Sequence, residues 1–253
     1  LVDNFKVAPS TGKWTVSQWT DDASSGVDAS YVYTHAYNFG SSANVTLNGV
    51  LFKGAAGANP KVTDQFSTVL FGNVFNNDAN NVTGSGGALA KDFIYSGADV
   101  TAGTSQTIAL TGLTPGTDYV ATVYSVAFDA PTPAMRWATM SVGNERLTFN
   151  QDTFGNDEGI RVSCRYTADA TGTAEIHLAP VNPVNVSIHV FGFSNREAIS
   201  RNAAPAVSLQ PMGTTVAQGL PVELSVAASG FPAPTYQWRL NGAAIAGATA
   251  ADY

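Results

Sequence analysis

The sequence predicts an all-β protein whose main part is a large jelly-roll-type β-sandwich. Apolar and polar residues alternate with period two along most of the 253 residues. No segment keeps the spacing of an amphipathic helix over three turns, so helix is expected only as single turns. The alternating runs before residue 200 are too many for a seven-strand sandwich. Two sheets with Greek-key connections would bury one face of each run.

Each predicted strand carries β-branched or aromatic residues at alternate positions. In chain order the strands are YVYTHAYNF (31–39), NVTLNGVLF (44–52), FSTVLFG (66–72), SQTIALTGL (105–113), DYVATVYSVAF (118–128), MRWATMSV (135–142), IRVSCRYTA (160–168), GTAEIHLA (172–179) and NVSIHVFGF (185–193). Clusters such as NNDANN, TPGTD and APTPA separate them and supply the residues that turns require.

The alternation lapses at AISRNAAPA (198–206), where a proline follows small and polar residues. Such a stretch is typical of an interdomain linker. We therefore expect a jelly-roll-like domain at 1–200, a linker at 201–205 and a second domain at 206–253.

The second domain resembles the front half of an immunoglobulin-like domain of the I-set kind. The resemblance is carried by Val226, Ala228, Gly230, Pro232, Pro234, Trp238 and the turn Asn241-Gly242. In that family a disulfide-bonded cysteine usually occupies the Val226 position and the tryptophan packs on it. The resemblance implies that valine replaces the disulfide by packing alone. Since it ends at Tyr253, we expect the other strands from a longer chain or from a neighbouring subunit.

The run LTGLTPGTDYVATVYS resembles the tyrosine corner of fibronectin type III domains, through Leu113, Pro115, Gly116 and Tyr119. The resemblance implies that the tyrosine hydroxyl is hydrogen-bonded to the preceding loop. More loosely, residues 1–200 resemble jelly-roll domains of large secreted bacterial surface proteins. That resemblance implies an extracellular, cell-surface location.

Composition excludes several classes of function. A net charge of −7 with only 12 Lys and Arg argues against nucleic-acid and anionic-membrane partners. No apolar run approaches the roughly 18 residues of a membrane span. The start, LVDNFKVAPS, is expected to be a processed or trimmed end. The single cysteine, Cys164, lies on the apolar face of IRVSCRY, opposite Arg161, Ser163 and Arg165, and predicts a buried, inert thiol.

The sequence shows no catalytic constellation, so we expect no enzyme, no catalytic residue and no organic cofactor. It has no G-x-S-x-G motif, and its three histidines all fall within predicted strands. Glu175 and His177 share one strand face. They could form an acid–base or metal-ligand pair, or only the solvent-facing side of a half-buried strand.

Aromatic side chains are the candidates for glycan binding. Tyr31, Tyr33, His35, Tyr37 and Phe39 alternate along one face of the first predicted strand. On an exposed sheet these rings could stack on sugars, whereas on an inward face they would be core. The same alternatives hold for Trp14, Trp19 and Trp137.

Calcium is the metal that the sequence favours, because acidic and amide side chains gather in loops. The candidate ligands of a structural Ca²⁺ are Asp152, Asn156, Asp157 and Glu158, in QDTFGNDEG. DDASSGVD and NNDANN offer similar oxygens, and none of the three has EF-hand spacing.

Two functions follow. The first is a non-catalytic extracellular structural or adhesive protein, a segment or subunit of a bacterial surface assembly such as a filament, whose partners are other copies of itself or further immunoglobulin-like domains. The alternative is a carbohydrate-binding module of a secreted polysaccharide-acting protein, with polysaccharide as partner.

Overall fold

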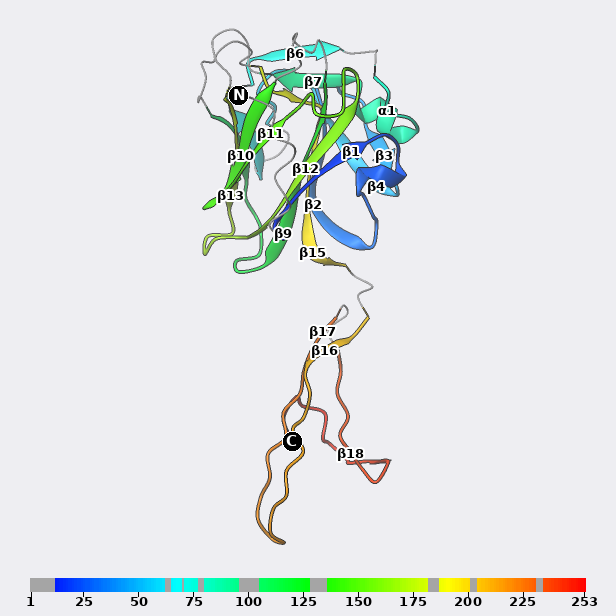
Figure 1. Ribbon diagram of the computed structural model, residues 1–253, viewed down its shortest axis with the longest axis vertical. Helices are drawn as coiled ribbons and strands as arrows, with labels where there is room; N and C mark the ends of the chain where they lie inside the picture. Colours follow the sequence, from blue (N-terminus) through cyan, green and yellow to red (C-terminus); the bar gives the residue numbers. More distant parts are fainter. Residues whose placement is uncertain are drawn as a thin grey trace, which may run out of the picture. The chain divides into compact units, whose positions relative to one another are not determined.

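The computed structural model describes residues 12–61, 65–69, 71–76, 80–95, 105–127, 136–181, 187–200, 204–230 and 234–253. The chain forms two compact units, Leu1–Ala198 (unit 1) and Ile199–Tyr253 (unit 2). Strands dominate unit 1 (Figure 1), and the described residues contain one α-helix, α1 (Ser85–Leu89), and one short 3-10 helix, η1 (Ala23–Ser25). Neither helix is long and apolar enough to cross a membrane. The prediction of an all-β, jelly-roll-type sandwich is confirmed.

The larger sheet of unit 1 has the strand order β1-β12-β9-β15-β2-β4-β3. The bounds are β1 (Trp14–Trp19), β12 (Gly159–Thr167), β9 (Asp118–Val126), β15 (Gly192–Ser200), β2 (Tyr31–Phe39), β4 (Val50–Ala55) and β3 (Val45–Leu47). The β2–β4 pair is parallel, whereas β1–β12, β12–β9, β9–β15 and β3–β4 are antiparallel.

A second sheet has the order β11-β10-β13-β8-β5, and a third has the order β14-β7-β6. The second comprises β11 (Glu145–Asn150), β10 (Trp137–Val142), β13 (Ala174–Pro180), β8 (Gln106–Leu110) and β5 (Phe66–Val69). The third comprises β14 (His189–Val190), β7 (Asp92–Tyr95) and β6 (Asn73–Asn76). All three sheets belong to unit 1.

Hydrophobic side chains pack on both faces of the larger sheet. On β9, Tyr119 and Val123 belong to one buried cluster, which also holds Met140 and Ile176 of the second sheet. The alternate residue Tyr124 belongs to another buried cluster. That second cluster includes residues of α1, β3 and β4. Because side chains of a strand alternate between faces, this second cluster lies on the outer face of the sheet, opposite the sandwich core.

Three details differ from the predicted strands. The run 44–52 is a hairpin rather than one strand, because Asn48 and Gly49 take φ values of 47° and 81° and close a tight turn between β3 and β4. The predicted strand 185–193 begins outside the described residues, and its described part, 187–193, changes sheets at Phe191, whose N–H donates to the Tyr124 carbonyl between β14 and β15. Strands β1, β6, β7 and β11 were not predicted; they have only four or six residues each.

Two predicted local features are present. The Thr114 N–H donates to the Tyr119 hydroxyl over 3.0 Å, the hydrogen bond expected of a tyrosine corner. Cys164 is a free, buried thiol. Burial raises the pKa of Cys164 to about 12, which keeps it in the unreactive thiol form.

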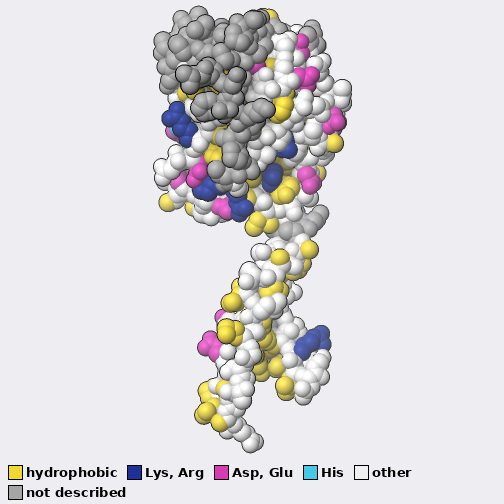
Figure 2. Space-filling view, viewed as in Figure 1, with side chains coloured by type: hydrophobic (Ala, Val, Ile, Leu, Met, Phe, Trp, Pro, Cys, Tyr) yellow, Lys and Arg dark blue, Asp and Glu magenta, His cyan; other side chains and the backbone are white. Residues whose placement is uncertain are grey.

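Unit 2 consists of short, open pairs of strands. They are β16 (Ala206–Leu209), β17 (Ala227–Ser229), β18 (Arg239–Leu240) and β19 (Ala243–Ala244). The rings of Trp238 and Tyr253 stack with centroids 5.8 Å apart, and the Trp238 Nε1–H donates to the Ala250 carbonyl. No described residue of 204–230 or 234–253 is buried. Figure 2 shows hydrophobic side chains at the surface of this unit.

Candidate functional site

The structure separates the seven aromatic candidates into two groups. Trp14, Trp19, His35 and Tyr37 are buried, at 3%, 0%, 4% and 4% exposure. Tyr31, Tyr33 and Trp137 are partly exposed. The predicted stripe on β2 is therefore core along its second half and reaches the surface only at its beginning.

The buried part of the stripe is held by ring packing and one backbone contact. The Tyr37 ring lies 4.1 Å from the Phe66 ring, centroid to centroid. His35 Nε2 lies 3.1 Å from the Gln65 carbonyl oxygen. Burial lowers the pKa of His35, so the neutral imidazole is favoured. These two side chains stabilise the sandwich and are not presented to a ligand.

The buried tryptophan Trp19 packs beneath α1. The centroids of the Trp19 and Tyr124 rings lie 5.2 Å apart, and the rings are arranged edge to face. A Cβ on Gly86 of α1 would lie 3.2 Å from the indole, so glycine at this position lets the helix approach the ring closely. Trp19 therefore anchors α1 to the outer face of the sheet.

The exposed end of the stripe meets an arginine. The guanidinium carbon of Arg196, on β15, lies 3.6 Å from the Tyr31 ring centroid, a cation–π contact. The Tyr33 hydroxyl accepts a hydrogen bond from the Asp28 N–H over 3.1 Å. Burial raises the pKa of Tyr33. Tyr33 thus supports the loop before β2, while Tyr31 stays accessible.

These residues border a surface hollow that we term the arginine recess. It has a volume of about 710 Å³ and is lined by Ala23, Gly26, Val27, Asp28, Ala29, Tyr31, Asn48, Arg161 and Arg196. Its rim, residues 22–29, is pinned by Asn48, whose amide Nδ2 donates to the carbonyls of Asp22 and Val27 over 2.7 and 3.0 Å. Hydrogen bonds from Asn48 therefore hold this rim of the recess in place.

The two arginines of the recess come from strands on either side of β9. Arg161 on β12 is paired in register with Tyr124, and Arg196 on β15 with Val120. The Arg161 guanidinium lies directly over the Cα of Gly26, where any Cβ would overlap it. Among the described residues, Asp28 is the only carboxylate that lines the recess. Hydrogen bonding from Ser30, with a smaller effect of Arg196, lowers the pKa of Asp28 and keeps it ionised.

A second hollow of about 650 Å³ lies among the ends of β8, β10, β12 and β13. It contains the ion pair Lys13–Glu145 at 2.6 Å. Glu175 and His177 lie on one face as the alternation predicts, with Oε2 and Nε2 3.3 Å apart. His177 Nδ1 is 3.0 Å from the Thr107 hydroxyl. Both members of the pair are more than a third exposed, as expected of the solvent-facing side of a strand.

The four candidate calcium ligands make hydrogen bonds within the protein. Asp152 is buried and accepts a hydrogen bond from the Arg136 N–H over 2.7 Å. Glu158 accepts hydrogen bonds from the side-chain amides of Gln18 and Asn81 over 2.9 and 2.7 Å. Asn156 donates to Asp157. Among the described residues, no group of three His, Cys, Asp or Glu is placed to hold a metal. A structural Ca²⁺ stays a prediction.

One buried polar cluster has no counterpart in the sequence reasoning. Arg136 Nη1 lies 2.9 Å from His189 Nε2, and both residues are buried. Gln151 Nε2 donates to the His189 carbonyl and to the Ser125 hydroxyl. Burial, with the nearby Arg136 charge, holds the pKa of His189 well below its usual value. The cluster fixes the start of β10 against β14.

Sequence reasoning also missed Arg161, Arg196 and Asn48 as site residues. One signal for Arg161 was present, since the alternation in IRVSCRY places it on the polar face of its strand. Nothing in the sequence relates it to Arg196, because their proximity depends on the order of strands in the sheet.

The fold resembles extracellular domains of plant receptors. The ANX2 ectodomain from Arabidopsis thaliana matches with a TM-score of 0.51 and 9% identity, over 65% of this chain and 49% of that chain. The ANXUR1 extracellular domain from Arabidopsis thaliana matches with a TM-score of 0.51 and 10% identity, over 65% and 48%. A structure of the plant peptide RALF23 in complex with FER and LLG2 matches with a TM-score of 0.50 and 11% identity, over 65% of this chain and 48% of that chain.

This chain spans about half the length of the matched chains. At such low identity the likeness shows the fold alone. No protein-family model matches the sequence. No curated protein matches it either.

Proposed function

We propose that unit 1 is a non-catalytic carbohydrate-binding module of an extracellular protein. The observation that carries this proposal is the arginine recess, where a partly exposed tyrosine ring borders a hollow lined by amide, carboxylate and guanidinium groups. Saccharide sites combine an aromatic surface for the C–H face of the sugar with polar groups for its hydroxyls. The recess offers both.

The size and rigidity of the recess suit an oligosaccharide. Its volume of about 710 Å³ falls in the range of small-molecule sites. Arg196 is held on the Tyr31 ring and by a hydrogen bond from its Nη1 to the Glu197 carbonyl over 3.0 Å. Groups that are already ordered lose less entropy when a ligand binds.

The extracellular location is part of the same proposal. The matched structures are those of an ectodomain and an extracellular domain. The β-sandwich fold that this chain shares with them supports a recognition domain outside the cell. The small number of charged side chains is consistent with the same location. Figure 2 shows that charged side chains are sparse and of mixed sign on the described part of the visible face of unit 1.

A binding role, rather than catalysis, is supported by the placement of the histidines. His35 and His189 are buried. His177 is exposed and already contacts Glu175 and Thr107. The single carboxylate that lines the recess, Asp28, is held ionised by Ser30. Acid–base hydrolysis of a glycoside uses two carboxyl groups across the scissile bond.

The test is glycan-array screening of the intact chain, followed by calorimetry with the best ligand and two variants of one residue. Tyr31→Ala removes the ring and frees Arg196, so affinity should fall at least tenfold. Tyr31→Phe keeps the ring and its cation–π contact, and affinity should stay within about twofold of the original. Full affinity in Tyr31→Ala, or no ligand on a broad array, would refute the proposal. Equal melting temperatures would show that both variants fold.

A second candidate function, structural or adhesive assembly, is favoured by the surface of unit 2. Leu209, Met212, Leu220 and Leu240 are between 52% and 81% exposed. Two-stranded sheets with open edges and exposed apolar residues tend to pair with further strands. Further immunoglobulin-like strands or other copies of the chain would then complete this unit. Light scattering over a range of concentrations should show association that Leu220→Glu weakens, and a monomer at every concentration would contradict it.

A further inference from the structure

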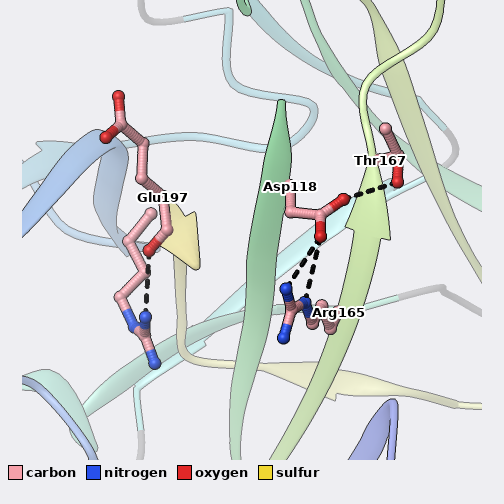
Figure 3. Close-up of polar contacts among 5 residues, drawn as sticks. Asp118, Arg165, Thr167 and Glu197 are labelled. Atoms are coloured by element: carbon pink, nitrogen blue, oxygen red, sulfur yellow. Dashed lines mark hydrogen bonds and ion pairs between the residues drawn. The ribbon is translucent and has the colours of Figure 1, made fainter. Parts of the chain in front are cut away.

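Three arginines lie on the outer face of the larger sheet of unit 1, and they differ in whether a carboxylate neutralises them. Arg165 is neutralised: its Nε and Nη2 donate to Asp118 Oδ2 over 3.3 and 2.8 Å. The Thr167 hydroxyl donates to the other oxygen of Asp118 over 2.6 Å. Figure 3 shows Asp118 held between Arg165 and Thr167. These contacts lower the pKa of Asp118, so the pair is fully charged and satisfied.

Arg161 and Arg196 have no such partner. Arg161 makes no hydrogen bond or ion pair with any described residue, and its Nε is buried without an acceptor. Within the described part of the chain, Arg196 makes one side-chain hydrogen bond, to the Glu197 carbonyl, and no ion pair. A buried donor that lacks an acceptor costs free energy, and the guanidinium group that carries this donor also lines the recess.

The recess is therefore positive within an acidic protein. Two guanidinium groups and one carboxylate line it, whereas the chain as a whole has a net charge of −7. Asp28 offsets only one of the two positive charges, and its Oδ1 also accepts a hydrogen bond from the Ser30 N–H over 2.8 Å. A guanidinium presents a planar fork of donors that matches a carboxylate or sulfate.

We infer that the arginine recess recognises an acidic saccharide, whose carboxylate or sulfate group binds between Arg161 and Arg196 while a sugar ring lies beside Tyr31 and Asn48. This inference rests on the carbohydrate-binding function proposed above and specifies the class of ligand. It assigns to the unpaired Arg161 an acceptor that the described residues of the protein do not provide.

The test compares matched oligosaccharides by calorimetry at one fixed salt concentration. The probes are an oligogalacturonate, its carboxyl-reduced neutral counterpart, and a sulfated oligosaccharide of similar length. The original protein should bind one or both acidic probes about tenfold or more tightly than the neutral one, the scale of a charge-assisted hydrogen bond. Preference between the two acidic probes identifies the anionic group.

Variants then locate the site. Arg161→Gln and Arg196→Gln should each lose about tenfold in affinity for the acidic probe and little for the neutral one. Arg165→Gln is the matched control, because Arg165 lies on the same strand as Arg161 but is already paired with Asp118, and should stay within about twofold. If Arg161→Gln unfolds, Arg161→Lys replaces it; the charge is kept, the fork is lost, and the affinity should still fall.

The outcomes separate the two claims. Equal binding of neutral and acidic probes overturns the acidic-ligand inference and leaves the carbohydrate-binding function standing. Failure of all three probes, together with an empty glycan array, overturns both. An equal loss in Arg165→Gln and Arg161→Gln would show attraction by overall charge and would also overturn the inference.

Discussion

Gly26 lines the arginine recess and lies against the Arg161 guanidinium. Gly26 has φ +70°, and a Cβ there would overlap the Arg161 guanidinium. Gly26→Ala should therefore have two effects. An L-residue in the left-handed region costs about 1 to 2 kcal/mol of stability. The added methyl group also displaces the flexible end of Arg161, which should reduce affinity for the acidic saccharide about tenfold, as in Arg161→Gln.

A matched control separates backbone strain from displacement of the arginine. Gly116 has φ +73°, and a Cβ there would meet nothing within 4 Å. Gly116→Ala should lose the same stability in urea unfolding, monitored by tryptophan fluorescence, and should keep its affinity. If Gly26→Ala binds like the original protein, Arg161 does not supply the anion contact. A loss of stability several kcal/mol larger than in Gly116→Ala would mean that the Arg161 side chain cannot move aside, which would refute the reasoning.

Three further predictions concern the fold. Gly159→Ala should lower the free energy of unfolding of unit 1 by about 1 to 3 kcal/mol in urea, because its Cβ would overlap a backbone carbonyl of β1. The control Gly72→Ala has open space around its Cβ and should lower it by less than about 0.5 kcal/mol, and an equal loss in both variants would contradict the close approach of Gly159 to β1. Tyr119→Phe should cost about 1 kcal/mol by removing the acceptor of the Thr114 N–H, and no change in the urea midpoint would contradict the tyrosine corner. Cys164 should react with a thiol reagent at pH 8 only after unfolding, and rapid native labelling would contradict its burial.

The sequence predicted those parts of the fold that depend on local pattern. Alternation identified β2, β9 and β12 closely, because each has nine residues with a clear apolar face. Short strands such as β6 and β7, four residues each, were missed because so few positions do not define a period. The hairpin at Asn48-Gly49 was missed although Asn-Gly is a strong turn signal, because apolar residues continued on both sides of it.

The second face of the larger sheet explains why the aromatic stripe was ambiguous. When a strand packs on a single face, the alternation of its apolar residues shows which side chains are buried. The second half of β2 instead has buried side chains on both faces, including Ala36 and Tyr37. The pattern alone therefore could not say where along the stripe burial begins. It begins at His35, and from there Tyr37 packs into the sandwich core on one face while Ala36 packs into the second cluster on the other.

Which arginines of the larger sheet are paired with a carboxylate could not be predicted from the sequence. Arg161 and Arg165 are the same residue type on the same face of one strand, yet one is neutralised by Asp118 and the other is not. The difference arises from register, because β9 places Asp118 opposite Thr167, beside Arg165, and places Tyr124 opposite Arg161. A shift of one residue would turn every side chain of a strand to the other face. What makes an arginine available to a ligand is thus the absence of a partner across the sheet, and only the paired strands reveal that absence.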